Sequence, residues 1–242
     1  MRFVQKKDYD QVSDLAAEIF IEELKKNPSI VLGLATGSTP LGLYERLVKS
    51  YQAGEISFAK AKSFNLDEYV GLPAEHQGSY SYYMQNNFFK HIDLPPEHAH
   101  VPWGLERNCM TECEQYDEMI EDAGGIDLLL LGVGENGHIA FNEPAPELIA
   151  KTHIVDLTEE TIEVNSRFFS DISEMPTQAI TMGMGSILGA RKIVLLITGE
   201  KKREVLRRLQ AEEAVTSEFP VSFLREHPDV TVIYDEKACD TK

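Results

Sequence analysis

Residues 30–51 read IVLGLATGSTPLGLYERLVKSY, and this stretch indicates the fold class. Its first part, Ile30–Ala35, is continuously apolar, as expected of a strand that is covered on both faces. Thr36–Pro40 interrupts the run with turn-forming residues, and Leu41–Tyr51 returns to the spacing of an amphipathic helix. A buried strand, a short loop and a helix in this order are typical of a parallel α/β sheet.

The same alternation continues along the chain. Apolar positions from Val12 to Leu24 follow helical spacing, and Asn27-Pro28 ends that helix. Further strands are predicted at Ala61–Leu66, Ile126–Val133, Thr152–Leu157, Ala179–Met182, Ile193–Thr198 and Val230–Tyr234. Helices are predicted at Tyr80–Phe89, Glu112–Glu121, Thr158–Phe169, Ser186–Ala190 and Lys201–Glu213. We therefore predict one α/β, Rossmann-like domain over residues 1–242, with a mainly parallel sheet and helices on both faces.

The charge balance disfavours several classes of partner. The 242 residues include 40 acidic and 23 basic side chains, for a net charge of −17. So acidic a chain is poorly suited to nucleic acid or to anionic lipid. The longest apolar run, Ile126–Val133, is far below the roughly 18–20 residues of a membrane span and contains Asp127.

The cysteines indicate a reducing compartment. Cys109, Cys113 and Cys239 are an odd number without a disulfide framework, and the amino terminus has no signal-peptide core. A cytoplasmic protein is therefore expected. Cys109 and Cys113 are spaced to share a helix face, but no second ligand pair accompanies them, so no metal site is predicted.

Ligands of parallel α/β sheets bind beyond the carboxyl ends of the strands, which directs attention to the loops after each strand. The loop in residues 36–40 combines Thr36, Gly37, Ser38 and Thr39 with Pro40 at the start of a helix. Backbone N–H groups there suit a phosphate-sized anion, and the alternative is an ordinary Ser or Thr cap. The pattern is no nucleotide fingerprint.

Two later loops carry proton-transfer groups. Asp67 and Glu68 follow a predicted buried strand, where a partly desolvated carboxylate can act as a general base; the alternative is a solvated, charged turn. Residues 132–144, GVGENGHIAFNEP, place His138 after a glycine-rich turn and Glu143 five residues beyond it. A histidine beside a carboxylate can shuttle a proton, although a lone histidine can also be purely structural.

Positive charge is concentrated later in the chain. Residues 101–165 contain 15 acids and 2 bases, whereas residues 166–208 contain 8 bases and 4 acids. Arg167 lies between aromatic neighbours in NSRFF, where a buried guanidinium needs an anion. Lys202 follows the predicted strand Ile193–Thr198, either at the same sheet edge as the other loops or as a solvated helix start.

Four segments together resemble the glucosamine-6-phosphate deaminase family, over about residues 1–235. They are LGLATGSTPLGLYERL at 32–47, FNLDEYVGL at 64–72, GVGENGHIAFNEP at 132–144 and NSRFF at 165–169. The GVGxxGH pattern alone is shared with related sugar-phosphate enzymes, whereas FNLDEYVGL and HIAFNEP are not.

The resemblance implies an isomerising hydrolase that turns glucosamine 6-phosphate into fructose 6-phosphate and ammonia, without metal or organic cofactor. It implies that Asp67 removes the proton from C2, and that His138 assists ring opening while Glu143 orients it. Phosphate binding is implied for Thr36, Gly37, Ser38, Thr39, Arg167 and Lys202, and Tyr80 is implied to cover the sugar.

The chain departs from the family pattern in two places. Many members have an aspartate where this chain has Asn136, so the ring-opening trio of Asn136, His138 and Glu143 holds one carboxylate. Longer, hexameric members are activated by N-acetylglucosamine 6-phosphate through basic residues soon after FNEP, where this chain has His153 and Val155. A monomer without this activator is expected.

Two other functions stay open at this stage. A 6-phosphogluconolactonase has a similar fold and glycine-histidine loop but needs no carbon base at Asp67. A non-catalytic sugar-phosphate sensor is the other alternative, although no basic helix-turn-helix precedes residue 30. Release of ammonia, hydrolysis of the lactone or binding without turnover separates the three.

Overall fold

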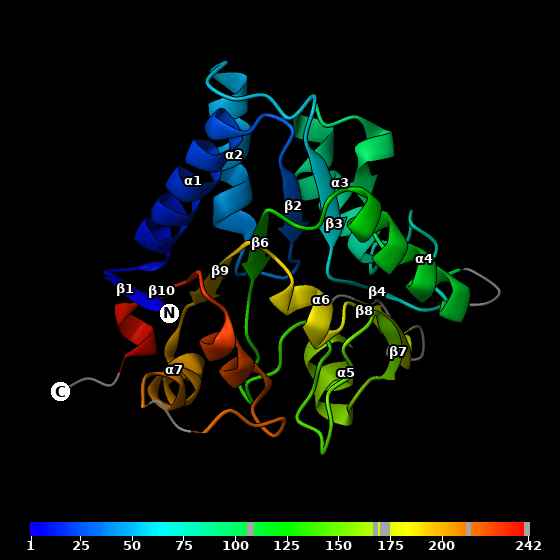
Figure 1. Cartoon of the computed structure of the whole chain (residues 1–242), viewed down its shortest axis with the longest axis vertical. Helices are drawn as coiled ribbons and strands as arrows, with labels where there is room; N and C mark the ends of the chain where they lie inside the picture. Colours follow the sequence, from blue (N-terminus) through cyan, green and yellow to red (C-terminus); the bar gives the residue numbers. More distant parts are fainter. Residues whose placement is uncertain (106–108, 167–168, 170–174, 212–213, 240–242) are drawn as a thin grey trace.

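Seven parallel strands form the central sheet of the computed structural model, which describes residues 1–105, 109–166, 169, 175–211 and 214–239. The strand order across the sheet is β1-β10-β9-β6-β2-β3-β5 (Figure 1). The strands are β1 (Arg2–Lys6), β2 (Val31–Leu34), β3 (Lys62–Asn65), β5 (Ala99–His100), β6 (Leu128–Leu131), β9 (Lys192–Ile197) and β10 (Val230–Asp235). The prediction of an α/β fold with a mainly parallel sheet is therefore confirmed.

Helices cover both faces of this sheet. They are α1 (Tyr9–Lys26), α2 (Leu41–Gln52), α3 (Tyr80–Asn87), α4 (Cys109–Asp122), α5 (Glu159–Ser166), α6 (Met184–Leu188) and α7 (Arg203–Gln210). Helices α1 and α2 lie on one side, and α6 and α7 lie on the other (Figure 1). No helix in the described ranges is long and apolar enough to cross a membrane.

The centre of the sheet is apolar on both faces. Every residue of β2 and of β6 is buried, which explains why these segments are almost uniformly aliphatic in sequence. Helix α1 covers the sheet with the buried stripe predicted from its spacing, including Val12, Ala16 and Phe20.

The order of the strands creates a crevice at the carboxyl edge. From β2 the chain moves outward to β3 and β5, and it then returns to β6 on the other side of β2. The loops that follow β2 and β6 therefore run to opposite sides of the sheet. Ligands of open α/β sheets bind at such a reversal.

A second, antiparallel sheet of three strands was not predicted. It consists of β4 (Asp67–Tyr69), β8 (Gln178–Thr181) and β7 (His153–Asp156), in the order β4-β8-β7. The strands expected near residues 152–157 and 179–182 exist, but their assignment to the parallel sheet is wrong. Local periodicity reports a strand without reporting its partner, because the pairing joins distant residues such as Asp67 and Thr181.

Other differences concern short elements. Strands β1 and β5 were missed because the first is a half-exposed edge and the second spans only two residues. The helix expected from Lys201 begins as a 3₁₀ turn at Glu200–Lys202 and becomes α-helical at Arg203. Among the described residues, no cluster of three or more His, Cys, Asp or Glu side chains suits a metal ion.

Gly183, which follows β8, packs closely against the backbone that precedes β7, and a substitution there tests this contact. A Cβ atom there would lie 2.2 Å from the Lys151 carbonyl oxygen and 2.5 Å from that of Ala150. Gly183→Ala should cost about 1–3 kcal/mol, because backbone must move, and each kcal/mol lowers Tm by about 2–4 °C in a chain of this size. Thermal unfolding measures this effect.

Gly132→Ala is the matched control, because a Cβ atom at Gly132 meets no atom within 4 Å. Equal Tm values for the two variants would show that the chain near Ala150 tolerates a side chain at Gly183.

Candidate active site

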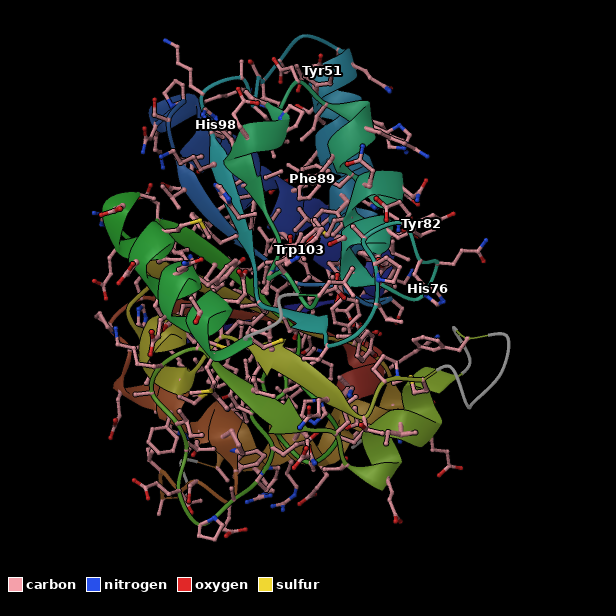
Figure 2. All side chains as sticks on the ribbon, turned by 90° about the vertical axis from the view of Figure 1, so that its right-hand side faces the viewer. Tyr51, His76, Tyr82, Phe89, His98 and Trp103 are labelled. Atoms are coloured by element: carbon pink, nitrogen blue, oxygen red, sulfur yellow. The ribbon has the colours of Figure 1, made fainter. Side chains whose placement is uncertain are left out.

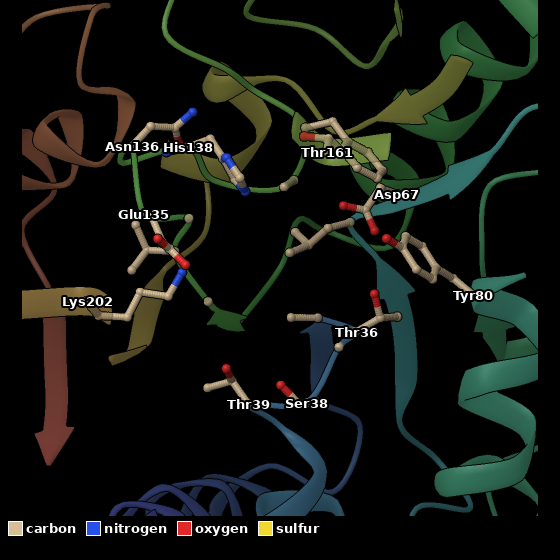
Figure 3. Close-up of a pocket in the computed structure, with 18 residues that line it drawn as sticks. Thr36, Ser38, Thr39, Asp67, Tyr80, Glu135, Asn136, His138, Thr161 and Lys202 are labelled. Atoms are coloured by element: carbon tan, nitrogen blue, oxygen red, sulfur yellow. Dashed lines mark hydrogen bonds between the residues drawn. The ribbon is translucent and has the colours of Figure 1, made fainter. Parts of the chain in front are cut away.

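One pocket of about 260 Å³ lies at the carboxyl edge of the sheet, where the reversal places it. The loops after β2, β3, β6 and β9 all contribute to its lining (Figure 3). The lining residues are Ala35, Thr36, Gly37, Ser38, Thr39, Leu66, Asp67, Tyr80, Gly132, Val133, Gly134, Glu135, Asn136, His138, Ala140, Phe141, Thr161 and Lys202. Most of the sequence-predicted residues thus meet in a single cavity.

The loop between β2 and α2 forms one wall of the pocket. Thr36, Ser38 and Thr39 all line the pocket; in Figure 3 Ser38 and Thr39 are neighbours, and Thr36 lies nearer Tyr80. Helix α2 has Pro40 at its N-cap, and no side chain of the loop caps it. The alternative of an ordinary Ser or Thr cap is therefore wrong for this helix. Gly37 has φ of 91°, a conformation that favours glycine.

Asp67 and Glu68 lie in strand β4 and not in a solvated turn. Asp67 is 6% exposed and faces the pocket, whereas Glu68 is 2% exposed (Figure 3). The Glu68 carboxylate accepts the backbone N–H groups of Tyr80 and Ser81 at 2.9 and 2.8 Å. Glu68 thereby stabilises the amino terminus of α3 and fixes Tyr80 beside Asp67.

The environment of Asp67 changes its acidity. Burial, reinforced by the nearby negative charge of Glu68, raises the pKa of the Asp67 carboxyl to about 8. With this raised pKa the carboxyl can both take up and release a proton near neutral pH. That property suits a general base or acid.

The glycine-rich loop after β6 places His138 on another wall. The Nδ1 atom of His138 lies 3.2 Å from Glu143 Oε2, and Asn136 Nδ2 donates to the same oxygen at 2.7 Å. The Asn136 Oδ1 atom accepts the His138 backbone N–H at 3.1 Å. Asn136, His138 and Glu143 are therefore one hydrogen-bonded group, with Glu143 behind the pocket lining.

Thr161 belongs to this group and was missed by the sequence analysis. Its hydroxyl donates to Glu143 Oε1 at 3.0 Å, so both carboxylate oxygens are held. Burial acts to raise the pKa of Glu143, but the bonds from His138, Asn136 and Thr161 outweigh it, and the pKa lies below its ordinary value. The pattern Thr158-x-x-Thr161 marks the start of α5 and holds no signal for a contact with a distant carboxylate.

The turn around His138 depends on small residues. A Cβ atom on Gly134 would lie 2.2 Å from the His138 ring, so only glycine fits beneath it. Ala140 has φ of 53°, and no other non-glycine residue in the described ranges has positive φ. This conformation costs about 1–2 kcal/mol and turns the chain back so that Glu143 reaches His138.

Two of the remaining predicted residues lie in the pocket. Tyr80 stands beside Asp67, and its hydroxyl donates to that of Tyr69 at 3.3 Å. Lys202 enters from the 3₁₀ turn after β9, near Glu135 in Figure 3. Arg167 lies outside the described residues.

Comparison with known proteins agrees with this geometry. The family model for glucosamine-6-phosphate isomerases and 6-phosphogluconolactonases matches residues 5–233. The chain belongs to this family. A glucosamine-6-phosphate deaminase of Clostridium perfringens is 49% identical over 238 residues, covering 98% of each chain. One of Thermoanaerobacter pseudethanolicus is also 49% identical, covering 98% of this chain and 94% of the relative.

Two solved structures superpose on the chain with different closeness. A monomeric glucosamine-6-phosphate deaminase superposes with a TM-score of 0.95 at 40% identity, covering 98% of both chains. The 6-phosphogluconolactonase of Thermotoga maritima superposes with a TM-score of 0.75 at 20% identity, covering 97% of this chain and 98% of that one. The second likeness shows the shared fold alone, whereas the first confirms the resemblance noted in the four sequence segments.

Asn136→Asp tests the charge balance of the His138 group. The change replaces the amide that donates to Glu143 by a second carboxylate beside the imidazole, so His138 should keep its proton to higher pH. An NMR titration of the imidazole signals in both proteins measures this shift. His98, at the amino ends of β3 and β5, is an internal control (Figure 2). Identical His138 midpoints in the two proteins would contradict the prediction.

Proposed function

We propose that this protein converts glucosamine 6-phosphate into fructose 6-phosphate and ammonia. The observation that carries the proposal is a buried carboxylate, Asp67, that shares one pocket with His138, whose ring is paired with Glu143 behind the lining. Relatives of 49% identity named as glucosamine-6-phosphate deaminases support the same reaction.

His138 begins the reaction by opening the sugar ring. Opening moves a proton from the anomeric hydroxyl to the ring oxygen, and a histidine on the pocket wall can carry it. Glu143 supports this step, because its negative charge stabilises the imidazolium that forms when the proton is on His138. Asn136 and Thr161 keep that carboxylate in place.

Asp67 then carries the isomerisation. As a base it takes the proton from C2 of the open sugar; the C2–H electron pair forms a C1=C2 double bond, and the carbonyl pair moves to O1, which becomes a hydroxyl. The proton then returns from Asp67 to C1 as the nitrogen lone pair forms C2=N, and the proton that the amine nitrogen loses balances the one gained by O1. The C2 amine becomes an imine, which water hydrolyses to the ketone of fructose 6-phosphate with release of ammonia. A positively charged substrate amine beside Asp67 also favours the ionised carboxylate that this step needs.

The phosphate group orients the substrate for both steps. Loop residues 36–39 and the side chain of Lys202 supply donors to the pocket, and of these Ser38, Thr39 and Lys202 lie across the pocket from Asp67 (Figure 3). Binding energy at the phosphate holds C1 and C2 beside the acid-base groups, which is the usual use of a non-reacting substrate group. Arg167 is proposed as a further phosphate ligand on the sequence resemblance alone.

Asp67→Asn tests the base. Ammonia release from glucosamine 6-phosphate should fall by about 10²–10⁴-fold, because an amide cannot accept the C2 proton. Asp156→Asn is the matched control, since this carboxylate lies on β7 and bonds to Gln178 outside the pocket. Wild-type turnover in the Asp67 variant would refute the assignment. If the wild-type protein hydrolysed the phosphogluconolactone instead, the proposed reaction itself would be wrong.

The same variant should be more stable than the wild type, with a defined pH dependence. Asp67 titrates near pH 8 when folded and near 3.9 when unfolded, so the folded protein loses stability as pH rises between these values. Asp67→Asn removes that loss. We expect a Tm gain at pH 8.5 of at least about 2–4 °C and a much smaller gain at pH 4, measured by calorimetry. Equal gains at both pH values would contradict burial of the charge as its cause.

We further propose a monomer with hyperbolic kinetics, in the cytoplasm. A monomeric relative at 40% identity supports the monomer, and His153 and Val155 stand where an activator site would need bases. Light scattering should give a mass near 27.2 kDa, and N-acetylglucosamine 6-phosphate should leave the rate curve unchanged. A sigmoidal curve that this compound makes hyperbolic would overturn the proposal.

A further inference from the structure

Tyrosine hydroxyls from three different helices hold the carbonyl groups of the loop between β2 and α2. Tyr44 of α2 donates to the carbonyl oxygen of Ala35 at 2.5 Å. Tyr83 of α3 donates to that of Gly37 at 2.6 Å. Tyr9, the first residue of α1, completes the set.

The Tyr9 hydroxyl is both a hydrogen-bond donor and an acceptor. It lies 3.1 Å from the carbonyl oxygens of both Ser38 and Thr39, and it accepts the backbone N–H of Gly42 at 2.8 Å. Gly42 is in the first turn of α2, so the Tyr9 oxygen satisfies a helix N–H that a Ser or Thr cap would ordinarily satisfy. The hydroxyls of Ser38 and Thr39 are therefore not needed as caps, and both residues line the pocket.

Close packing of α1 against α2 brings Tyr9 to the loop. A Cβ atom on Gly42 would lie 2.4 Å from Ser13 Oγ and 3.0 Å from the Tyr9 ring. Glycine at this position thus allows α1 to approach closely enough for the Tyr9 hydroxyl to reach three backbone groups.

The direction of the carbonyls determines the direction of the amides. In a planar trans peptide unit the C=O and the next N–H point to opposite sides. Carbonyls of Ala35, Gly37 and Ser38 that point to tyrosines therefore turn the N–H groups of Thr36, Ser38 and Thr39 the other way. The pocket lining formed by the described residues includes these three residues but none of the three tyrosines.

We propose that Tyr9 and Tyr83 are positioning residues that hold the amides of this loop in the orientation that binds the phosphate of the substrate. The inference rests on the proposed function, because it takes a sugar phosphate as the ligand of the loop. Adjacent N–H dipoles that point the same way repel one another, and bonds on the carbonyl side offset that repulsion before the anion arrives. The loop then loses little conformational freedom on binding.

The hydroxyls of Tyr83 and Tyr44 remain donors at every working pH. Burial raises the pKa of the Tyr83 hydroxyl above its ordinary value, and the nearby Tyr9 adds to the shift. Burial likewise raises the pKa of Tyr44. The bonds from these two hydroxyls therefore persist over the pH range in which Asp67 titrates.

The test compares Tyr9→Phe and Tyr83→Phe with Tyr51→Phe and Tyr82→Phe. The two control tyrosines lie on α2 and α3 and are labelled in Figure 2. For the test variants, KM for glucosamine 6-phosphate and the calorimetric Kd of inorganic phosphate should both rise about three- to tenfold, the worth of one hydrogen bond. The kcat should stay within about twofold of wild type, because the chemistry lies elsewhere in the pocket.

The outcomes separate the inference from the proposed function. If the test variants bind phosphate as tightly as the controls, or lose kcat at unchanged KM, the positioning role is wrong. If the wild type releases no ammonia, the proposed reaction fails, and the calorimetric comparison still decides the role of the tyrosines. A wild type that does not bind phosphate overturns the inference as well. Should Tyr83→Phe fail to fold, Tyr9→Phe carries the test, since Tyr9 is only half-buried.

Discussion

The parallel pairing of β2 with β6 is the constraint on which the site depends. Leu32 pairs with Leu128 and Gly33 with Leu129, although the chain has meanwhile formed β3 and β5 on the other side of β2. Asp127 strengthens the start of this pair by accepting the Val31 N–H at 2.9 Å. Because the two strands lie side by side and their loops diverge, the crevice between the loops is an outcome of strand order.

Burial gives this crevice an acid, Asp67, whose pKa lies near neutral pH. A carboxylate costs free energy when it leaves water, and Asp67 is kept in β4 by the pairing of that strand with β8. Glu68 is also buried, but the N–H groups of α3 satisfy it. Two adjacent acids thus have different tasks, because successive side chains of a strand point to opposite sides. One anchors a helix, and the other faces the pocket.

The proposed phosphate site is compatible with the acidic composition of the chain. Backbone N–H groups carry no formal charge, so they attract an anion without a large basic surface. In this chain the tyrosines supply the orientation, and Lys202 supplies a local positive charge. The net charge of −17 therefore opposes long polyanions while leaving one small anion site intact.

The sequence by itself determined the α/β class, the family and the candidate loops, because strand-loop-helix periodicity and motifs such as FNLDEYVGL are local features. It singled out Asp67 and His138 as candidate proton-transfer residues, because a carboxylate after a buried strand and a histidine after a glycine-rich turn are also local features. Only the tertiary structure decided that β4, β7 and β8 form a separate antiparallel sheet, that Thr161 holds Glu143, and that Tyr9 and Tyr83 bond to carbonyl groups of the loop between β2 and α2. These contacts join residues that are far apart in the chain. Neither the pairing of strands nor the direction of a hydroxyl group produces a periodic pattern in the sequence.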